Sequence, residues 1–212
     1  MFWGFKEIKL SFLSLVRHGQ SEWNEKNLFT GWENPGLTIK GKEEAKYAGS
    51  TLSELNISYD YFYTSVLDRA ILTAEIIINA MGIEDFDLIK AKDLNERDYG
   101  DLTGLNKDDA RKKWGDDQVH TWRRSFDTQP PNGESLKDTA DRVIPYYQDE
   151  ILTKLKEDKN ILISAHGNSL RALIMYIEKL SPNEILKREI GTGKPIVYNF
   201  NVSKETFSLE HE

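Results

Sequence analysis

The sequence predicts an α/β fold: a single-domain, three-layer sandwich with a mostly parallel central sheet and helices on both faces. Two observations predict it. Apolar strands alternate with amphipathic helices along the chain, and two of these strands, far apart in the sequence, each end in His-Gly. A chain of 212 residues fits one domain, residues 1–212. Residues 1–9 are apolar but interrupted by Lys6, Glu7 and Lys9, so we interpret them as an N-terminal extension and not as a targeting segment.

The charge balance limits the partners that this chain can bind. A formal net charge of −7 argues against nonspecific binding to nucleic acid or to an anionic membrane, because both require a basic face. An anionic small molecule fits if the positive charges are clustered locally. The chain has no cysteine, so it forms no disulfide and no thiolate metal site, which suits a cytoplasmic protein.

The first strand is predicted to deliver a reactive histidine. Residues 10–16 are apolar except for two serines, as in a strand buried on both faces, and the run stops at Arg17. Gly19 allows a tight turn and a close approach of a ligand to the backbone. His18 would then lie at the carboxyl end of a strand, where open α/β sheets bind their ligands.

Two strand and helix units follow. Residues 25–37 form a loop rich in turn-forming residues, and Thr38 caps an amphipathic helix. Residues 59–64 are predicted to form a strand, and Ser65 to cap a helix that runs to Met81.

The middle of the chain is more polar. Residues 88–91 form a short strand, 94–105 a loop without periodicity, and 106–114 a helix. The break at 129–133, Gln-Pro-Pro-Asn-Gly, is too short for a domain linker.

The last third repeats the opening arrangement. A helix is predicted over 134–156, with a kink or a late start because of Pro145. The strand 160–165 ends in His166-Gly167, and Asn168 and Ser169 cap the next helix. Residues 195–201 and 205–209 are predicted to be final, paired strands.

Histidine, arginine and carboxylate side chains in these loops point to phosphoryl transfer. Arginines near a histidine favour its neutral, nucleophilic form and also bind the oxygens of a phosphoryl group. Glu96 could protonate a leaving alkoxide, although pairing with Arg97 is the competing interpretation. His120 and His211 lack such a setting and are interpreted as surface residues. The available cations are Arg17, Arg69, Arg97, Lys107, Arg123, Arg124 and Arg171, with an ordinary solvated surface as the alternative.

Seven motifs between about Leu13 and Tyr198 resemble the cofactor-dependent phosphoglycerate mutase family of the histidine phosphatase superfamily. They are Leu-Val-Arg-His-Gly-Gln-Ser-Glu-Trp-Asn, Phe-Thr-Gly-Trp, Tyr-Thr-Ser with Arg69, Leu-Asn-Glu-Arg-Asp-Tyr-Gly, Gly-Leu-Asn-Lys, Trp-Arg-Arg and Ala-His-Gly-Asn-Ser-Leu-Arg-Ala-Leu. The Arg-His-Gly alone marks only the superfamily, whereas Glu-Arg-Asp-Tyr-Gly, Gly-Leu-Asn-Lys and Trp-Arg-Arg together indicate the mutase branch.

The resemblance implies an isomerase of glycolysis and gluconeogenesis. It would interconvert 3-phosphoglycerate and 2-phosphoglycerate through 2,3-bisphosphoglycerate, which primes a phosphohistidine at His18, with Glu96 as proton donor and acceptor and no metal. The implied catalytic residues are Arg17, His18, Arg69, Glu96 and His166. The implied substrate-binding residues are Arg17, His18, Gly19, Gln20, Ser21, Glu22, Trp23, Asn24, Thr30, Gly31, Arg69, Glu96, Arg97, Asp98, Tyr99, Lys107, Arg123, Arg124, Gly167 and Asn168.

Two departures and two alternatives accompany this resemblance. Longer family members carry an insertion where this chain runs directly from Pro131 to Glu134, and a longer tail than the residues after Gly193. Both segments bear on subunit contacts and closure, so a homodimer or a homotetramer, and the balance of mutase and bisphosphatase activity, stay open. The alternatives are a phosphatase of the same fold that transfers the phosphoryl group to water, and a non-catalytic phospholigand-binding protein.

Overall fold

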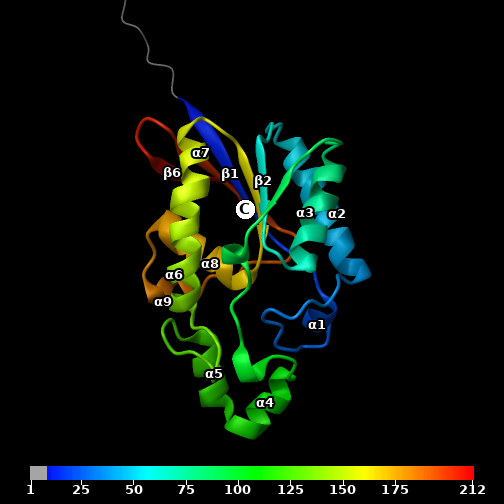
Figure 1. Ribbon diagram of the computed structural model, residues 1–212, viewed down its shortest axis with the longest axis vertical. Coiled ribbons are helices and arrows are strands. Elements are labelled where there is room, and N and C mark those ends of the chain that lie inside the picture. The colour runs from blue at the N-terminus through cyan, green and yellow to red at the C-terminus, as the bar shows by residue number, and fades with distance from the viewer. Residues whose placement is uncertain (1–8) are drawn as a thin grey trace, which may run out of the picture.

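A computed structural model describes residues 9–212 of the chain (Figure 1). The expected N-terminal extension therefore lies outside the described residues, apart from Lys9, whose carbonyl accepts a hydrogen bond from Val202 N at 3.1 Å. The described residues form a six-stranded sheet in the order β3-β2-β4-β1-β5-β6. Its strands are β1 (Leu10–Arg17), β2 (Tyr61–Thr64), β3 (Leu88–Lys90), β4 (Ile161–Ala165), β5 (Pro195–Asn201) and β6 (Thr206–His211).

The two strands that end in His-Gly are direct neighbours in this sheet. β1 and β4 pair in parallel, with Arg17 opposite Ala165, so the carboxyl ends of both strands lie at the same edge of the sheet. The pairs β2–β3 and β2–β4 are also parallel, whereas β5 pairs antiparallel with β1 and β6 antiparallel with β5. The sequence prediction of a mostly parallel sheet with paired final strands is confirmed.

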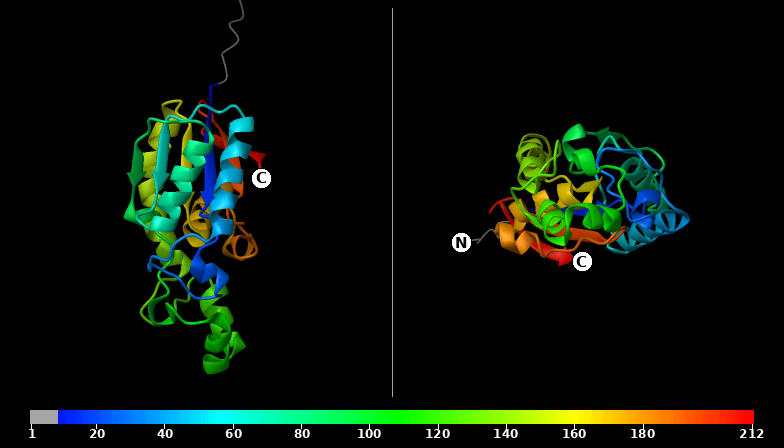
Figure 2. Two further views of the ribbon diagram at one scale, coloured as in Figure 1. Left: turned by 90° about the vertical axis from the view of Figure 1, so that its right-hand side faces the viewer. Right: turned by 90° about the horizontal axis from the view of Figure 1, so that it is seen from below.

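Helices cover both faces of the sheet because alternate residues of the central strands are apolar on either side. Val16 and Leu162 pack with α2 (Ile39–Glu54) and α3 (Asp68–Ala80). Leu15 and Ile163 face the opposite way. They pack under the other layer, formed by α6 (Leu136–Tyr146), α7 (Leu152–Lys156) and α8 (Gly167–Glu178). Figures 1 and 2 show these two helical layers, which confirm the expected α/β sandwich.

A separate pair of helices lies beyond the carboxyl ends of the parallel strands, at the bottom of Figure 1. These helices are α4 (Lys107–Trp114) and α5 (Asp116–Arg124), and they pack on a small cluster of buried hydrophobic side chains around Phe29 and Val119. The expected helix at 106–114 is present and begins after Asn106, whose side chain caps it. α5 was not predicted, because Val119 is its single buried residue and its apolar pattern is weak. The remaining short helices are α1 (Glu22–Glu25) and α9 (Pro182–Ile185), and the loop after β3 contains 3₁₀ turns at Lys92–Leu94 and Gly100–Leu102.

Of the helix N-caps predicted beside the histidines, Ser65 and Asn168 were wrong, whereas Ser169 takes part in the capping box of α8. Ser65 does not cap α3, which begins three residues later at Asp68 after Leu67, because the Ser65 hydroxyl bonds His166 and Leu67 N instead. The cap of α8 is His166 itself. Asn168 and Ser169 lie within its first turn, and Ser169 Oγ accepts from His166 N at 3.1 Å, because strand and helix join with no intervening turn.

Of the two expected effects of Pro145, the late start is wrong, and in place of a simple kink the helix contains a π-helical irregularity. α6 begins at Leu136, two residues after the expected Glu134, behind a Ser135 capping box. A π-helical segment, Tyr147–Ile151, follows the proline and connects α6 to α7. The irregularity thus keeps one nearly continuous helix over β1 and β4.

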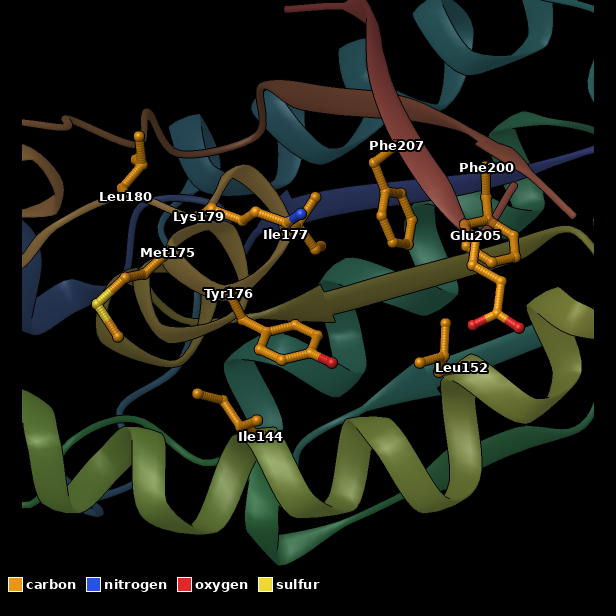
Figure 3. A pocket seen from close by; sticks show the side chains of 10 residues that line it. All are labelled: Ile144, Leu152, Met175, Tyr176, Ile177, Lys179, Leu180, Phe200, Glu205 and Phe207. Carbon is orange, nitrogen blue, oxygen red and sulfur yellow. The ribbon is translucent and has the colours of Figure 1, made fainter. Parts of the chain in front are cut away.

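An apolar pocket of about 470 Å³ lies between α6, α8 and the β5–β6 hairpin (Figure 3). Met175, Tyr176, Phe200 and Phe207 are among the side chains that line it. It shares no lining residue with the cavities beside His18 that are described below. Within residues 9–212, the helices are all too short or too polar to cross a membrane.

Candidate active site

His18 is buried at the carboxyl end of β1 with one ring nitrogen fixed. Its backbone N donates to Ala165 O at 2.9 Å, and its Nδ1 lies 2.7 Å from Gly19 O. Because a carbonyl oxygen only accepts, Nδ1 carries the proton and Nε2 keeps its lone pair. Burial and the charges of Arg69 and Arg17 hold the pKa of His18 well below 6.5, so the ring is neutral at pH 7.

His166 faces His18 from the end of β4 and is bonded through its other ring nitrogen. The two ring centres are 5.0 Å apart, and Ser65 Oγ lies 2.7 Å from His166 Nε2. Ser65 Oγ also accepts from Leu67 N, and because a hydroxyl oxygen can accept two hydrogen bonds, the contact with Nε2 fits either tautomer of His166. Nδ1 of His166 is buried and has no hydrogen-bond partner among the described residues. With the ring proton on Nδ1, His166 presents an unused donor. Burial, followed by the charge of Arg69, lowers its pKa and keeps the ring neutral.

Two arginines add further unused donors beside the histidines. Arg69 is held by Glu33 O at 2.7 Å and Gly31 O at 2.9 Å, and Arg17 by Ile190 O at 2.9 Å. The Nε atoms of both arginines are buried without a partner among residues 9–212. Burial lowers the pKa of Arg69 to about 10, so Arg69 remains a cation at pH 7. Buried, unpaired donors around neutral imidazoles make this a pocket for an anion.

Glu96 is a buried carboxylate with one oxygen committed and one available. Its Oε1 accepts from Arg97 N at 2.8 Å, Asn168 Nδ2 at 2.9 Å and Asn168 N at 3.1 Å. Every hydrogen bond that the described residues make to this carboxylate ends on Oε1. Burial alone would raise the pKa of the carboxyl, but the Arg97 amide, the Arg17 charge and the Asn168 side chain outweigh it and lower the pKa. Without ligand, Glu96 is a base.

Two neighbouring cavities share lining residues at these groups. The first, which we call the histidine cavity, has a volume of about 60 Å³. The second, the outer cavity, measures about 140 Å³. Arg17, Glu96, Tyr99 and Lys107 line both of them. The histidine cavity is completed by His18, Asn24, Leu28, Phe29, Thr30 and Arg69, and the outer cavity by Arg123, Arg124, Gly167, Asn168, Arg171 and Glu189.

Several residues expected in the site line neither cavity, and some of them support the site through other contacts. Arg97 is buried and donates to the carbonyls of Trp122 and Arg123 at 3.2 and 3.4 Å, which ties the basic end of α5 to the Glu96 loop. Gly19 lies so close to α2 that an added Cβ would sit 2.1 Å from Gly41 O. The other expected residues outside both cavity linings are Gln20, Ser21, Glu22, Trp23, Gly31, Asp98 and His166.

Their contacts explain these placements. Ser21 caps α1, Gln20 N bonds Glu44, and the Gly31 carbonyl holds Arg69. Asp98 Oδ1 accepts a hydrogen bond from Gly100 N at 2.9 Å and so stabilises the turn there. Glu22 is exposed and Trp23 half-buried.

Sequence reasoning left four cavity residues without a role. Arg171 counted only as an available cation, Leu28 and Phe29 were placed in the loop 25–37 without a role of their own, and Glu189 was not considered. Arg171 follows Gly167 by four residues on α8, and that helical spacing would have placed both on one face. Glu189 gives no comparable signal, because it lies in an irregular segment between α9 and β5.

The described residues contain no cluster of three or more histidine, cysteine, aspartate or glutamate side chains that could hold a metal ion. The donors at the site are guanidinium, ammonium, amide and imidazole groups, and two carboxylates, Glu96 and Glu189, lie among them. This set suits an anionic, phosphorylated ligand.

Comparisons with known proteins agree with this chemistry. The chain is 58% identical over 196 residues to the 2,3-bisphosphoglycerate-dependent phosphoglycerate mutase of Rhodopseudomonas palustris, covering 92% of this chain and 95% of that one. A relative of the same name from Parvibaculum lavamentivorans is 56% identical over 191 residues, 90% of this chain and 91% of its own.

Among solved structures, the protein titled mycobacterial hydrolase 1 superposes with a TM-score of 0.82. It is 22% identical and the match covers 95% of this chain and 97% of that one, which supports the fold alone. Residues 13–211 match the family model described as histidine phosphatase superfamily (branch 1). The chain therefore belongs to the histidine phosphatase superfamily and, within it, to the family of 2,3-bisphosphoglycerate-dependent phosphoglycerate mutases.

Proposed function

We infer that this protein is a phosphoglycerate mutase, an isomerase that interconverts 3-phosphoglycerate and 2-phosphoglycerate in glycolysis and gluconeogenesis. The observation that carries the inference is a set of three buried nitrogens, Arg17 Nε, Arg69 Nε and His166 Nδ1, which have no hydrogen-bond partner among residues 9–212 and lie around a neutral His18. The two guanidinium N–H groups, and His166 with its proton on Nδ1, match the equatorial oxygens of a transferring phosphoryl group. These groups also fit 2,3-bisphosphoglycerate, which supplies the phosphoryl group when bound.

His18 is proposed as the nucleophile. Its Nε2 forms the N–P bond while the P–O bond to the glycerate breaks, so the phosphoryl group passes to the ring and the electron pair stays on the glycerate oxygen. The Nδ1–H bond to Gly19 O steadies the ring as it becomes cationic. His166 Nδ1, Arg17 and Arg69 hold the three oxygens that carry the developing charge.

Glu96 is proposed to move the proton of the glycerate hydroxyl. Its carboxylate takes that proton when the hydroxyl attacks phosphohistidine, and returns it to the alkoxide in the opposite direction. The charges of Arg17 and Arg69 lower the pKa of this carboxyl. A bound phosphoryl group neutralises those charges, which raises the pKa and allows Glu96 to hold the proton between the two half-reactions.

The outer cavity is proposed to retain the rest of the substrate. Lys107, Arg123 and Arg124 line it and would hold the carboxylate and the second phosphate while the glycerate reorients. A phosphatase that transfers to water has less need of this set, which favours the mutase. Longer family members exist, but the length of this chain does not argue against a mutase. The match covers 95% of a mutase relative, which is therefore of similar length.

A coupled assay on 3-phosphoglycerate tests the function. Turnover that requires 2,3-bisphosphoglycerate and is indifferent to a chelator is expected. Phosphate release without 2-phosphoglycerate would identify a phosphatase, and binding without either product would identify a non-catalytic phospholigand-binding protein.

We propose the cytoplasm as the compartment, because a chain without cysteine suits reducing conditions. A homodimer or a homotetramer stays a prediction, which size-exclusion chromatography with light scattering can test.

A further inference from the structure

Glu189 lies between two residues whose backbone is held by site arginines. The carbonyl of Arg188 accepts from Arg171 Nε at 3.1 Å, and that of Ile190 accepts from Arg17 Nη1 at 2.9 Å. The segment between α9 and β5 is thus fixed on both sides of Glu189 by guanidinium groups that line the outer cavity. The backbone position of Glu189 is set, and its side chain is the part that can move.

The Glu189 carboxylate spans two of the cations of the outer cavity. Its Oε1 accepts from Arg124 Nη2 at 3.0 Å, and its Oε2 lies 3.5 Å from Arg171 Nη2. The Glu189 side chain is 69% exposed, whereas that of Arg171 is 12% exposed. The contact joins the end of α5 to α8 across the cavity. The Glu189 carboxylate therefore pairs with Arg124, which the proposed function assigns to the substrate, and with Arg171 beside it.

We propose that Glu189 is an internal competitor for the distal anionic group of the ligand, and so helps to set which anions this site accepts. Its carboxylate holds Arg124 and Arg171 until a ligand with two anionic groups spans both cavities and displaces it. This inference rests on the proposed function for the identity of the ligand, a phosphoglycerate. The competition itself depends only on the contacts of Glu189.

The arrangement discriminates between one and two anionic groups. A single phosphate ion fits the histidine cavity, beside His18 and Arg69, and leaves Glu189 in place. A phosphoglycerate also reaches the outer cavity and must displace the carboxylate, which a side-chain rotation achieves without moving the backbone. Ion pairs with one exposed partner are weak, so the competition is expected to be modest, about three- to tenfold in affinity.

The test compares Glu189→Gln with the wild type in calorimetric titrations on enzyme free of 2,3-bisphosphoglycerate. The variant keeps the size of the side chain and removes its charge. The dissociation constant of 3-phosphoglycerate is expected to fall about three- to tenfold, while that of inorganic phosphate changes less than about twofold. Glu205→Gln is the matched control. Glu205 is 59% exposed and pairs with Lys156 at 2.8 Å, away from both cavities, so neither constant should change.

Two results would overturn the inference. An unchanged or weaker affinity of Glu189→Gln for 3-phosphoglycerate would mean that Glu189 positions the arginines for the substrate. An equal fall in the dissociation constant of inorganic phosphate would indicate a general effect of the lost negative charge and not competition for the distal group. Failure of the proposed function gives a different result from failure of this inference. If Glu189→Gln binds 3-phosphoglycerate more tightly but the wild type shows no turnover, the competition stands and the mutase function is refuted. If the wild type turns over and the binding constants of the variant are unchanged, the mutase function stands and the competition is refuted.

Discussion

His18 and His166 face each other with ring centres 5.0 Å apart and ring planes inclined by 59°. Their roles differ because their hydrogen bonds differ: Nδ1 of His18 is bonded to Gly19 O, and Nε2 of His166 to Ser65 Oγ. His18 therefore keeps the lone pair of Nε2, and His166 leaves Nδ1 free, which is a donor when it carries the ring proton. This pairing of a nucleophile with a donor underlies the proposed chemistry.

Replacing the nucleophile tests this assignment directly. His18→Ala is expected to lower turnover by at least about 10⁴-fold, because the covalent path is lost. It should also abolish the acid-labile phosphate that labelled 2,3-bisphosphoglycerate introduces. His120→Ala, at an exposed position of α5, is the control and should label normally. A His18→Ala enzyme that still incorporates the label would exclude His18 as the nucleophile.

The pH dependence of enzyme phosphorylation reports the state of His18. Burial and the charges of Arg69 and Arg17 lower its pKa, and only protonation removes the lone pair, so reactivity should persist below the ordinary histidine value of about 6.5. In Arg69→Gln one of these charges is lost, so the pKa of His18 rises and the acidic decline moves to higher pH.

Single-turnover rates of phosphorylation by 2,3-bisphosphoglycerate, measured from about pH 5 to pH 8, provide the comparison. Titration of the substrate is common to both enzymes, so the difference between the two profiles belongs to the protein. Coinciding profiles would show that Arg69 does not set the protonation of His18.

Arg124 tests the role of the outer cavity. Arg124→Ala is expected to reduce mutase activity more than bisphosphatase activity, because the mutase must retain the second anionic group during reorientation. Roughly a tenfold difference between the two losses is expected for one charge-assisted contact. Lys112→Ala, on the exposed face of α4, serves as the control. Equal losses of both activities would refute the retention argument.

Gly19 tests the contact between the nucleophile loop and α2. Gly19→Ala would place a Cβ 2.1 Å from Gly41 O, and a backbone carbonyl in a packed helix cannot move aside without cost. The free energy of unfolding should fall by about 1–3 kcal/mol in urea titrations, with a loss of activity because His18 shifts. At Gly36 the nearest atom to an added Cβ is 3.7 Å away, so Gly36→Ala should change stability by no more than about 0.5 kcal/mol. Similar stabilities of the two variants would contradict the tight contact.

The sequence predicts most of the sheet because the strands that carry the histidines are strongly apolar and each ends in a polar turn. Neighbouring parallel strands then bring His18 and His166 together, as the pairing of Arg17 with Ala165 confirms. The caps could not be assigned in the same way. A serine before a helix predicts a cap, yet Ser65 serves His166, and this depends on a residue about one hundred positions away.

The outer cavity was harder to anticipate for a similar reason. Arg124, Arg171 and Glu189 come from three segments that meet only in the folded chain. Local patterns describe the helices that carry the arginines, but the pairing of Glu189 with both arginines depends on how the segment before β5 is anchored. The contacts that complete a site are tertiary, and single-sequence periodicity does not report them.

The position of β1 between β4 and β5 has a consequence for the order of assembly during synthesis. The strand that carries His18 emerges from the ribosome before both of its sheet neighbours, which come from residues 161–201. Until those residues have been translated, the apolar β1 has neither partner strand, and loop closure over such a sequence separation is slow. The nascent chain thus carries its nucleophile long before it has the strands that complete a working site.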